Sequence, residues 1–98
     1  MAANKKLTGV IGGRTIKTAG AGDGVLNITF NDGSTMKIKT GAAVITDAMS
    51  GHMIKSVRQQ GTTMNLDFTD GSSAQVALAE ATSSVMLRDA KGAMEYAD

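Results

Sequence analysis

A chain of 98 residues and 10.0 kDa has the size of a single domain. It contains no cysteine and one histidine, which excludes disulfide scaffolds, iron–sulfur centres, cysteine nucleophiles and multi-histidine metal sites, and we expect no cofactor. The net charge of +1 argues against a protein whose main work is binding nucleic acid, although basic residues prevail in 1–40 and acidic residues in 41–98.

The N-terminal segment carries no signal for export. Lys5 and Lys6 precede the stretch Leu7–Gly12, which is too short and too rich in glycine for the apolar region of a secretory signal. No part of the chain approaches the roughly 20 apolar residues that cross a bilayer. We therefore expect a cytoplasmic protein with no membrane association.

An internal repeat aligns residues Gly13–Lys39 with Gly51–Ala77 without gaps. The identical columns are Gly13/Gly51, Ile16/Ile54, Lys17/Lys55, Asn27/Asn65, Phe30/Phe68, Asp32/Asp70, Gly33/Gly71 and Ser34/Ser72. Self-similarity at a fixed spacing predicts that each copy is one supersecondary unit that buries its apolar face against the other. We expect one domain, 1–98, with a pseudo-twofold axis and matching interior positions for the two phenylalanines.

Apolar and polar residues alternate within each copy, over Leu26–Phe30 and over Met64–Phe68. This period of two predicts a half-buried strand. Asp32 and Asp70 follow, each before a glycine, and Asp-Gly is a dipeptide that accepts the positive φ angles of a tight hairpin. Each copy therefore contains a predicted hairpin.

A first strand is predicted ahead of each hairpin, at Gly13–Lys17 and at Gly51–Lys55. The connections to the second strand are Gly20–Gly24 and Arg58–Thr62, where the copies differ most, as expected of surface loops. Each copy is thus a predicted three-stranded meander.

A linker, Gly41–Ser50, joins the copies, and the sequence leaves open whether 42–53 contains a short helix. After the second copy, Ser84–Arg88 and Ala93–Tyr96 flank a turn that opens with Asp89, which predicts a C-terminal hairpin over 84–96. The expected fold is all-β or nearly so: two tandem three-stranded meanders plus this hairpin, in a small sandwich or barrel-like body.

Cations recur at matching positions of the repeat. Arg14 aligns with His52, and Lys17 aligns with Lys55. Two equivalent cations that converge on an axis can hold a phosphate or a carboxylate. The structural alternative is that they are surface donors, with the lysines protecting strand edges from aggregation.

The C-terminal hairpin adds Arg88 and Tyr96, residue types that are enriched at interface hot spots. The candidate ligand-binding residues are Arg14, Lys17, His52, Lys55, Arg88 and Tyr96.

Signals for catalysis are weak. Asp32 and Asp70 are explained by turn geometry, and the serines lack a base because His52 is the one histidine. The glycines of Gly20–Gly24 resemble a phosphate cradle, but no Gly-Lys-Ser/Thr follows and no helical pattern begins there. We expect a protein that is not an enzyme.

Asp-Gly-Ser after a strand, together with the terminal segment Ser83–Asp98, resembles small proteins of phages and proteobacterial mobile elements. The resemblance implies an accessory protein that blunts host defences. Few aromatic residues and seven methionines suit an adaptable interface, so we expect a homo-oligomer. The expected function is sequestration of a small anionic, nucleotide-like host-defence signal. The alternative is a protein-binding inhibitor of a host complex or a structural particle component.

Overall fold

The structure, a computed structural model, describes residues 2–44, 46 and 49–98. In these residues the chain forms one short helix and nine strands, whose order along the chain is β1 (Ala2–Ala3), α1 (Lys5–Ile11), β2 (Ile16–Gly22), β3 (Val25–Phe30), β4 (Thr35–Lys39), β5 (Ile54–Gln60), β6 (Thr63–Phe68), β7 (Ser73–Ala77), β8 (Val85–Arg88) and β9 (Met94–Ala97). The strands make two antiparallel sheets, one ordered β1-β5-β6-β7 and the other β2-β3-β4-β8-β9.

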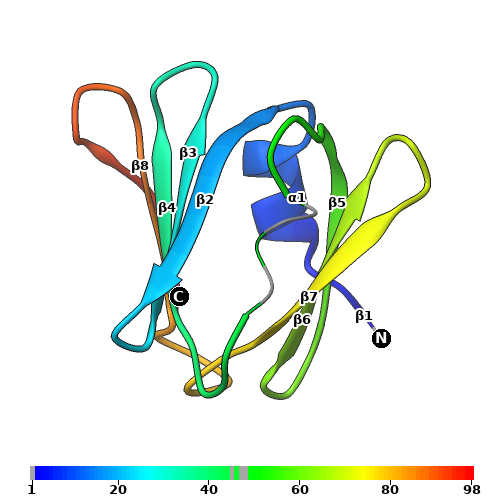
Figure 1. Cartoon of the computed structure of the whole chain (residues 1–98), viewed down its shortest axis with the longest axis vertical. Coiled ribbons are helices and arrows are strands. Elements are labelled where there is room, and N and C mark those ends of the chain that lie inside the picture. The colour runs from blue at the N-terminus through cyan, green and yellow to red at the C-terminus, as the bar shows by residue number, and fades with distance from the viewer. Residues whose placement is uncertain (1, 45, 47–48) are drawn as a thin grey trace.

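The two sheets lie on opposite sides of the molecule, with α1 between them at one end (Figure 1). They are not closed into a barrel, so the predicted mostly-β fold is confirmed in its sandwich form. Phe30 and Phe68 are at most 1% exposed and both belong to the core that the two sheets share, in the matching positions that the repeat predicts.

Each copy of the repeat is a meander, β2-β3-β4 and β5-β6-β7, but the predicted bounds of its first strand were wrong. β2 runs through most of the predicted loop Gly20–Gly24, and only Asp23 and Gly24 make the turn, with φ of 55° and 75°. Positive φ at both central positions is the pattern of a type I′ turn, whose twist matches the flanking strands and needs only two residues. Likewise, most of the predicted loop Arg58–Thr62 belongs to β5.

A β-bulge interrupts the first strand of each copy at the repeated lysine. Ile16 pairs with Phe30 and Thr18 with Thr29, so that Lys17 is the extra residue. Lys55 is the extra residue in the second copy. A bulge shifts the alternation by one residue, and the lysine side chain is thereby left exposed.

The Asp-Gly hairpins have three-residue loops, not two-residue ones. In the first, the Gly33 N–H donates to Phe30 O at 3.0 Å and the Phe30 N–H donates to Ser34 O at 2.9 Å, with Gly33 at φ 89°. This is a tight turn closed by a left-handed glycine, and Asp32 contributes its side chain: its carboxylate accepts hydrogen bonds from the Ser34 N–H and hydroxyl.

The two copies meet through backbone contacts between equivalent residues. Thr15 bridges its own counterpart Met53, and Thr40 bridges its counterpart Leu78. Hydrogen bonds around the first bridge also occur in matching pairs, because the Ile16 N–H donates to His52 O and the Ile54 N–H donates to Arg14 O, each at 2.9 Å. An antiparallel bridge between equivalent residues has the geometry of a pseudo-twofold axis.

The C-terminal hairpin forms β8 and β9 as predicted, and β8 adds to the edge of β4. The sequence analysis missed α1, which Asn4 caps by accepting a hydrogen bond from the Leu7 N–H at 3.0 Å. The question of a helix in 42–53 falls partly on residues 45 and 47–48, outside the described residues. The described part of that segment contains a turn near Met49 and no helix.

Candidate functional site

Arg14 and His52, which occupy the same column of the repeat, each lie beside an aspartate of their own copy. The Arg14 guanidinium lies 3.6 Å from the Asp32 carboxylate, and His52 Nδ1 lies 2.9 Å from the Asp70 carboxylate. Each also lies over the phenylalanine of its copy: the His52 ring stacks on Phe68 at 4.8 Å, and the Arg14 guanidinium is 6.0 Å from the Phe30 ring. The repeat therefore conserves a structural cluster at these positions.

Arg14 makes further contacts that His52 does not. Its two terminal nitrogens donate to the Glu95 carboxylate at 2.8 and 3.0 Å, and one also donates to the buried Ser34 hydroxyl at 2.9 Å. The hydrogen bonds to Glu95 raise the pKa of the Arg14 guanidinium further. This bidentate ion pair joins the start of the first copy to β9. It also neutralises the Arg14 charge that would otherwise attract an anionic ligand.

The carboxylates of both clusters are stabilised in their charged form. Hydrogen bonds from Ser34 lower the pKa of Asp32, with Arg14 a smaller cause, and hydrogen bonds from Ser72 lower the pKa of Asp70, with His52 a smaller cause. Because the turn serine outweighs the cation in each case, the turns themselves hold these aspartates charged.

The remaining predicted residues lie apart. Lys17 and Lys55 are exposed at their bulges, and the Arg88 guanidinium donates to Gly92 O at 2.9 Å across its own hairpin. Tyr96 is 5% exposed, and its hydroxyl lies 3.3 Å from the side chains of both Asn4 and Asp98. Burial is the main cause that raises the pKa of Tyr96.

Among the described residues, no hydrogen bond or ion pair joins two of the six predicted residues. In the described residues the Arg14 guanidinium pairs with Asp32 and Glu95, and the His52 ring lies beside Asp70.

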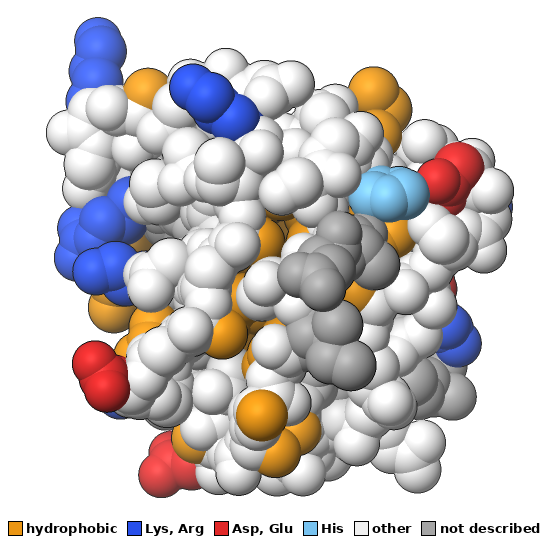
Figure 2. Space-filling model, viewed as in Figure 1, with side chains coloured by type: hydrophobic (Ala, Val, Ile, Leu, Met, Phe, Trp, Pro, Cys, Tyr) orange, Lys and Arg blue, Asp and Glu red, His pale blue; other side chains and the backbone are white. Residues whose placement is uncertain are grey.

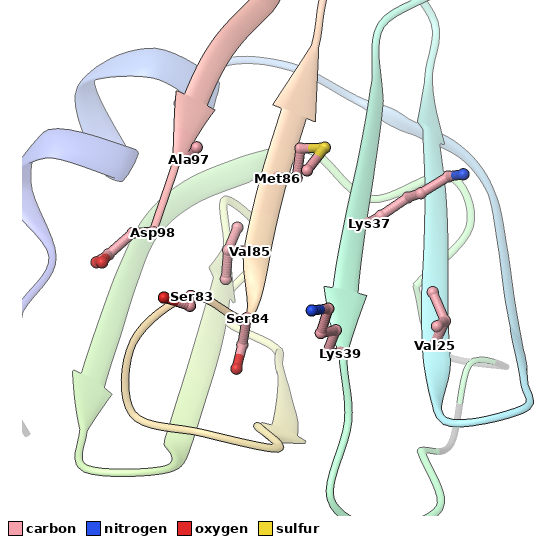
Figure 3. Close-up of a pocket in the computed structure, with 9 residues that line it drawn as sticks. All are labelled: Val25, Lys37, Lys39, Ser83, Ser84, Val85, Met86, Ala97 and Asp98. Carbon is pink, nitrogen blue, oxygen red and sulfur yellow. The ribbon is translucent and has the colours of Figure 1, made fainter.

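A cleft of about 470 Å³ lies elsewhere, on the outer face of the five-stranded sheet (Figure 3). The residues that line it come from β3, β4, β8, β9, the segment before β8 and the residue after β9: Val25, Lys37, Lys39, Ser83, Ser84, Val85, Met86, Ala97 and Asp98. Its floor is made of sheet side chains, and its two cations are neighbours on one face of β4.

Lys37 and Lys39 are both exposed, and they alternate with Met36 and Ile38, which are buried in the core. Within the described part of the chain, neither lysine has a carboxylate partner in an ion pair. They differ in this from Arg14 and Arg58, whose guanidinium groups pair with aspartate or glutamate.

The second copy has no such cations. Gln75 and Ala77 occupy the positions of Lys37 and Lys39. On that outer face Arg58 and Asp67 form an ion pair at 2.7 Å, so their charges compensate each other. The hydrogen bond from Arg58 is the main cause that lowers the pKa of Asp67. Because β7 forms the equivalent strand with Gln75 and Ala77 at these positions, the two lysines are not needed to form the sheet.

Lysine and arginine side chains gather on the side of the molecule formed by the five-stranded sheet, as Figure 2 shows. Sequence reasoning missed Lys37 and Lys39 because it looked for cations that the repeat keeps. The usable signal in the sequence was a difference between the copies: two cations, two residues apart on a strand, occur in the first copy and not in the second.

A second hollow, also of about 470 Å³, is lined by Ala21–Gly24 and Thr40–Val44. This includes the glycine run that resembled a phosphate cradle, but its lining carries a carboxylate, Asp23, and no cation. Such a lining disfavours an anion.

The described residues contain no group of three or more metal-ligating side chains close enough to hold an ion. None of the helices in the described part of the chain is both long enough and apolar enough to span a bilayer. Comparison of the chain with protein-family models, with curated proteins and with solved structures found no match.

Proposed function

We propose that this chain is a non-enzymatic binding protein that takes up a small anionic, nucleotide-like ligand in the cleft over β4. The observation that carries the proposal is the pair Lys37 and Lys39, two exposed cations without carboxylate partners in the described structure, beside apolar side chains. The volume of about 470 Å³ lies within the range of small-molecule sites.

The chemistry of the lining suits a phosphorylated aromatic compound. Lysine ammonium groups bind phosphate as point charges, and Val25 and Met86 offer apolar surface on which a planar ring can lie. Of the nine residues in this described lining, Asp98 is the one carboxylate and none is a histidine, so the cleft is better suited to holding a ligand than to proton transfer.

Sequestration of a host-defence signal in the cytoplasm by a phage or mobile-element protein is the biological role that we propose for such binding. Its basis is the resemblance of the Asp-Gly-Ser turn and the terminal segment Ser83–Asp98 to proteins of mobile elements. We further propose that the protein works as a homo-oligomer, which a native mass of two or more times 10.0 kDa would establish.

A protein-facing role is the second candidate, either as inhibitor of a host complex or as a particle component. Three exposed methionines favour it: Met53, Met86 and Met94 are 42%, 38% and 50% exposed. Methionine adapts its shape to a partner surface.

A thermal-shift screen with nucleotides tests the first candidate. A ligand at about 100 times its Kd stabilises the native state by about 2.7 kcal/mol, which raises the Tm of a chain of this size by roughly 10 °C or more. Lys37→Gln and Lys39→Gln should reduce the shift. Lys91→Gln is the matched control, because Lys91 is exposed in a hairpin loop outside the cleft.

Two results would contradict the proposal. An unchanged shift in both cleft variants would place the ligand elsewhere. No shift with any nucleotide would leave the protein-facing role as the better explanation of the exposed methionines.

A further inference from the structure

The side chains in the cleft are arranged in cross-strand rows. Lys37 of β4 is directly opposite Met86 of β8, and Lys39 of β4 is directly opposite Val25 of β3. Each lysine therefore has one apolar neighbour, and the two neighbours lie on opposite sides of β4.

This arrangement has an approximate local twofold centre at Ile38. Ile38 pairs with Leu26 on one side and with Val85 on the other, so it stands midway between the two rows. A half-turn about the sheet normal at Ile38 exchanges Lys37 with Lys39 and the Met86 position with the Val25 position. Figure 3 shows the four side chains on the same face of the sheet, with the Lys37 ammonium pointing toward β3 and the Lys39 ammonium toward β8.

The spacing favours two anionic groups over one. Residues two apart on a strand are separated by roughly 6.5–7 Å. Ammonium groups that also point apart serve two phosphates better than the oxygens of a single phosphate. Val25 and Met86, on the two sides of β4, provide apolar surface for two attached rings.

We infer that the ligand of this cleft carries two phosphates and two planar rings related by a twofold axis, the chemistry of a cyclic dinucleotide. This inference rests on the proposed function and names the ligand class for the same site. The twofold match is confined to the cations and their apolar neighbours. The next positions, Asn27 and Ser84, differ, since Asn27 is exposed while Ser84 is buried and exchanges hydrogen bonds with the Glu80 backbone.

Calorimetric titration with three ligands of the same base tests the inference: a cyclic dinucleotide, the linear dinucleotide and the mononucleotide. We expect one cyclic dinucleotide to bind per chain, at least tenfold tighter than the mononucleotide, because the mononucleotide has one phosphate and one ring and engages only half of the site. Lys37→Gln and Lys39→Gln should each weaken the cyclic ligand by about tenfold and by factors that agree within about threefold.

The apolar neighbours provide a second, independent pair of variants. Met86→Ala and Val25→Ala should each weaken the cyclic ligand by similar factors of about three to ten, whereas Met94→Ala, which alters an exposed methionine outside the cleft, should have no effect. All five side chains are at least partly exposed, so these variants are expected to fold.

The titrations distinguish failure of the twofold inference from failure of the proposed function. Equal affinity for mononucleotide and cyclic dinucleotide, or a loss that depends on one lysine alone, overturns the twofold inference while the anion-binding cleft stands. Absence of binding by all three ligands overturns the proposed function and the inference together.

Discussion

Arg14 and His52 show how one column of a repeat can keep a structural role while its residue type changes. Both lie over a phenylalanine and bind the aspartate of the adjacent turn, although one is a guanidinium and the other an imidazole. The sequence could indicate that the column matters. It could not indicate that Asp32 and Asp70, assigned only to turn geometry, also bind the cations, because that depends on the direction in which each side chain leaves its strand.

The turn aspartates should make stability depend on pH at the acid end. The pKa of Asp32 is lowered in the folded chain, so its contribution is present above the ordinary aspartate pKa of 3.8 and is lost as the pH falls from there through the lower folded value. Asp32→Asn should therefore flatten the loss of Tm between about pH 4 and pH 2, while the difference at pH 7 stays below about 1 kcal/mol because the carboxylate is exposed.

Thermal melts of wild type and Asp32→Asn across this range measure the effect. Asp23→Asn is the control, an exposed aspartate of another turn with no ion pair in the described structure. Parallel pH profiles for all three proteins would contradict the assignment.

At the level of elements, the strands were predictable because their alternation is regular, whereas α1 was missed. The helix has seven residues and includes Gly9, so its propensity is weak, and it is stabilised by burying Leu7 and Ile11 against the sandwich. The Asn4 cap followed by apolar residues at helical spacing was a usable signal. The bulges at Lys17 and Lys55 were not predictable from the alternation, because they are set by the partner strand.

The hairpin of β8 and β9 should be an integral part of the core. Leu87 is fully buried while its neighbour Met86 is 38% exposed on the other face of the same strand. Leu87→Ala should lower the free energy of unfolding by about 2–5 kcal/mol, and Met86→Ala by less than about 1 kcal/mol. Urea denaturation measures both values, and similar losses would show that β8 does not pack as described.

On the scale of the whole molecule, the internal repeat indicated the fold correctly, since its two copies form two meanders with matching buried positions. The candidate site was not predictable in the same way. Lys37 and Lys39 come together with Met86 and Asp98 only because the C-terminal hairpin extends one copy's sheet and not the other's. A site made by such asymmetry is invisible to a comparison of the repeats with each other.

The matching interior positions predict matching energetics. Phe30→Leu and Phe68→Leu should each lower the free energy of unfolding by about 1–3 kcal/mol, and the two losses should agree within about 1 kcal/mol, because both rings are buried in one core next to side chains of the same repeat column. Urea denaturation of both variants provides the measurement. A difference of more than about 2 kcal/mol would show that the copies are not energetically equivalent.

The bridges Thr15–Met53 and Thr40–Leu78 join residues to their own counterparts, and this bears on the origin of the chain. Such a backbone contact can form between two copies within one chain or between two separate chains. A pair of identical polypeptides, each half as long, can form the same contacts, and gene duplication with fusion would join such a pair into one chain whose halves are then free to differ, as they do at Lys37 and Lys39.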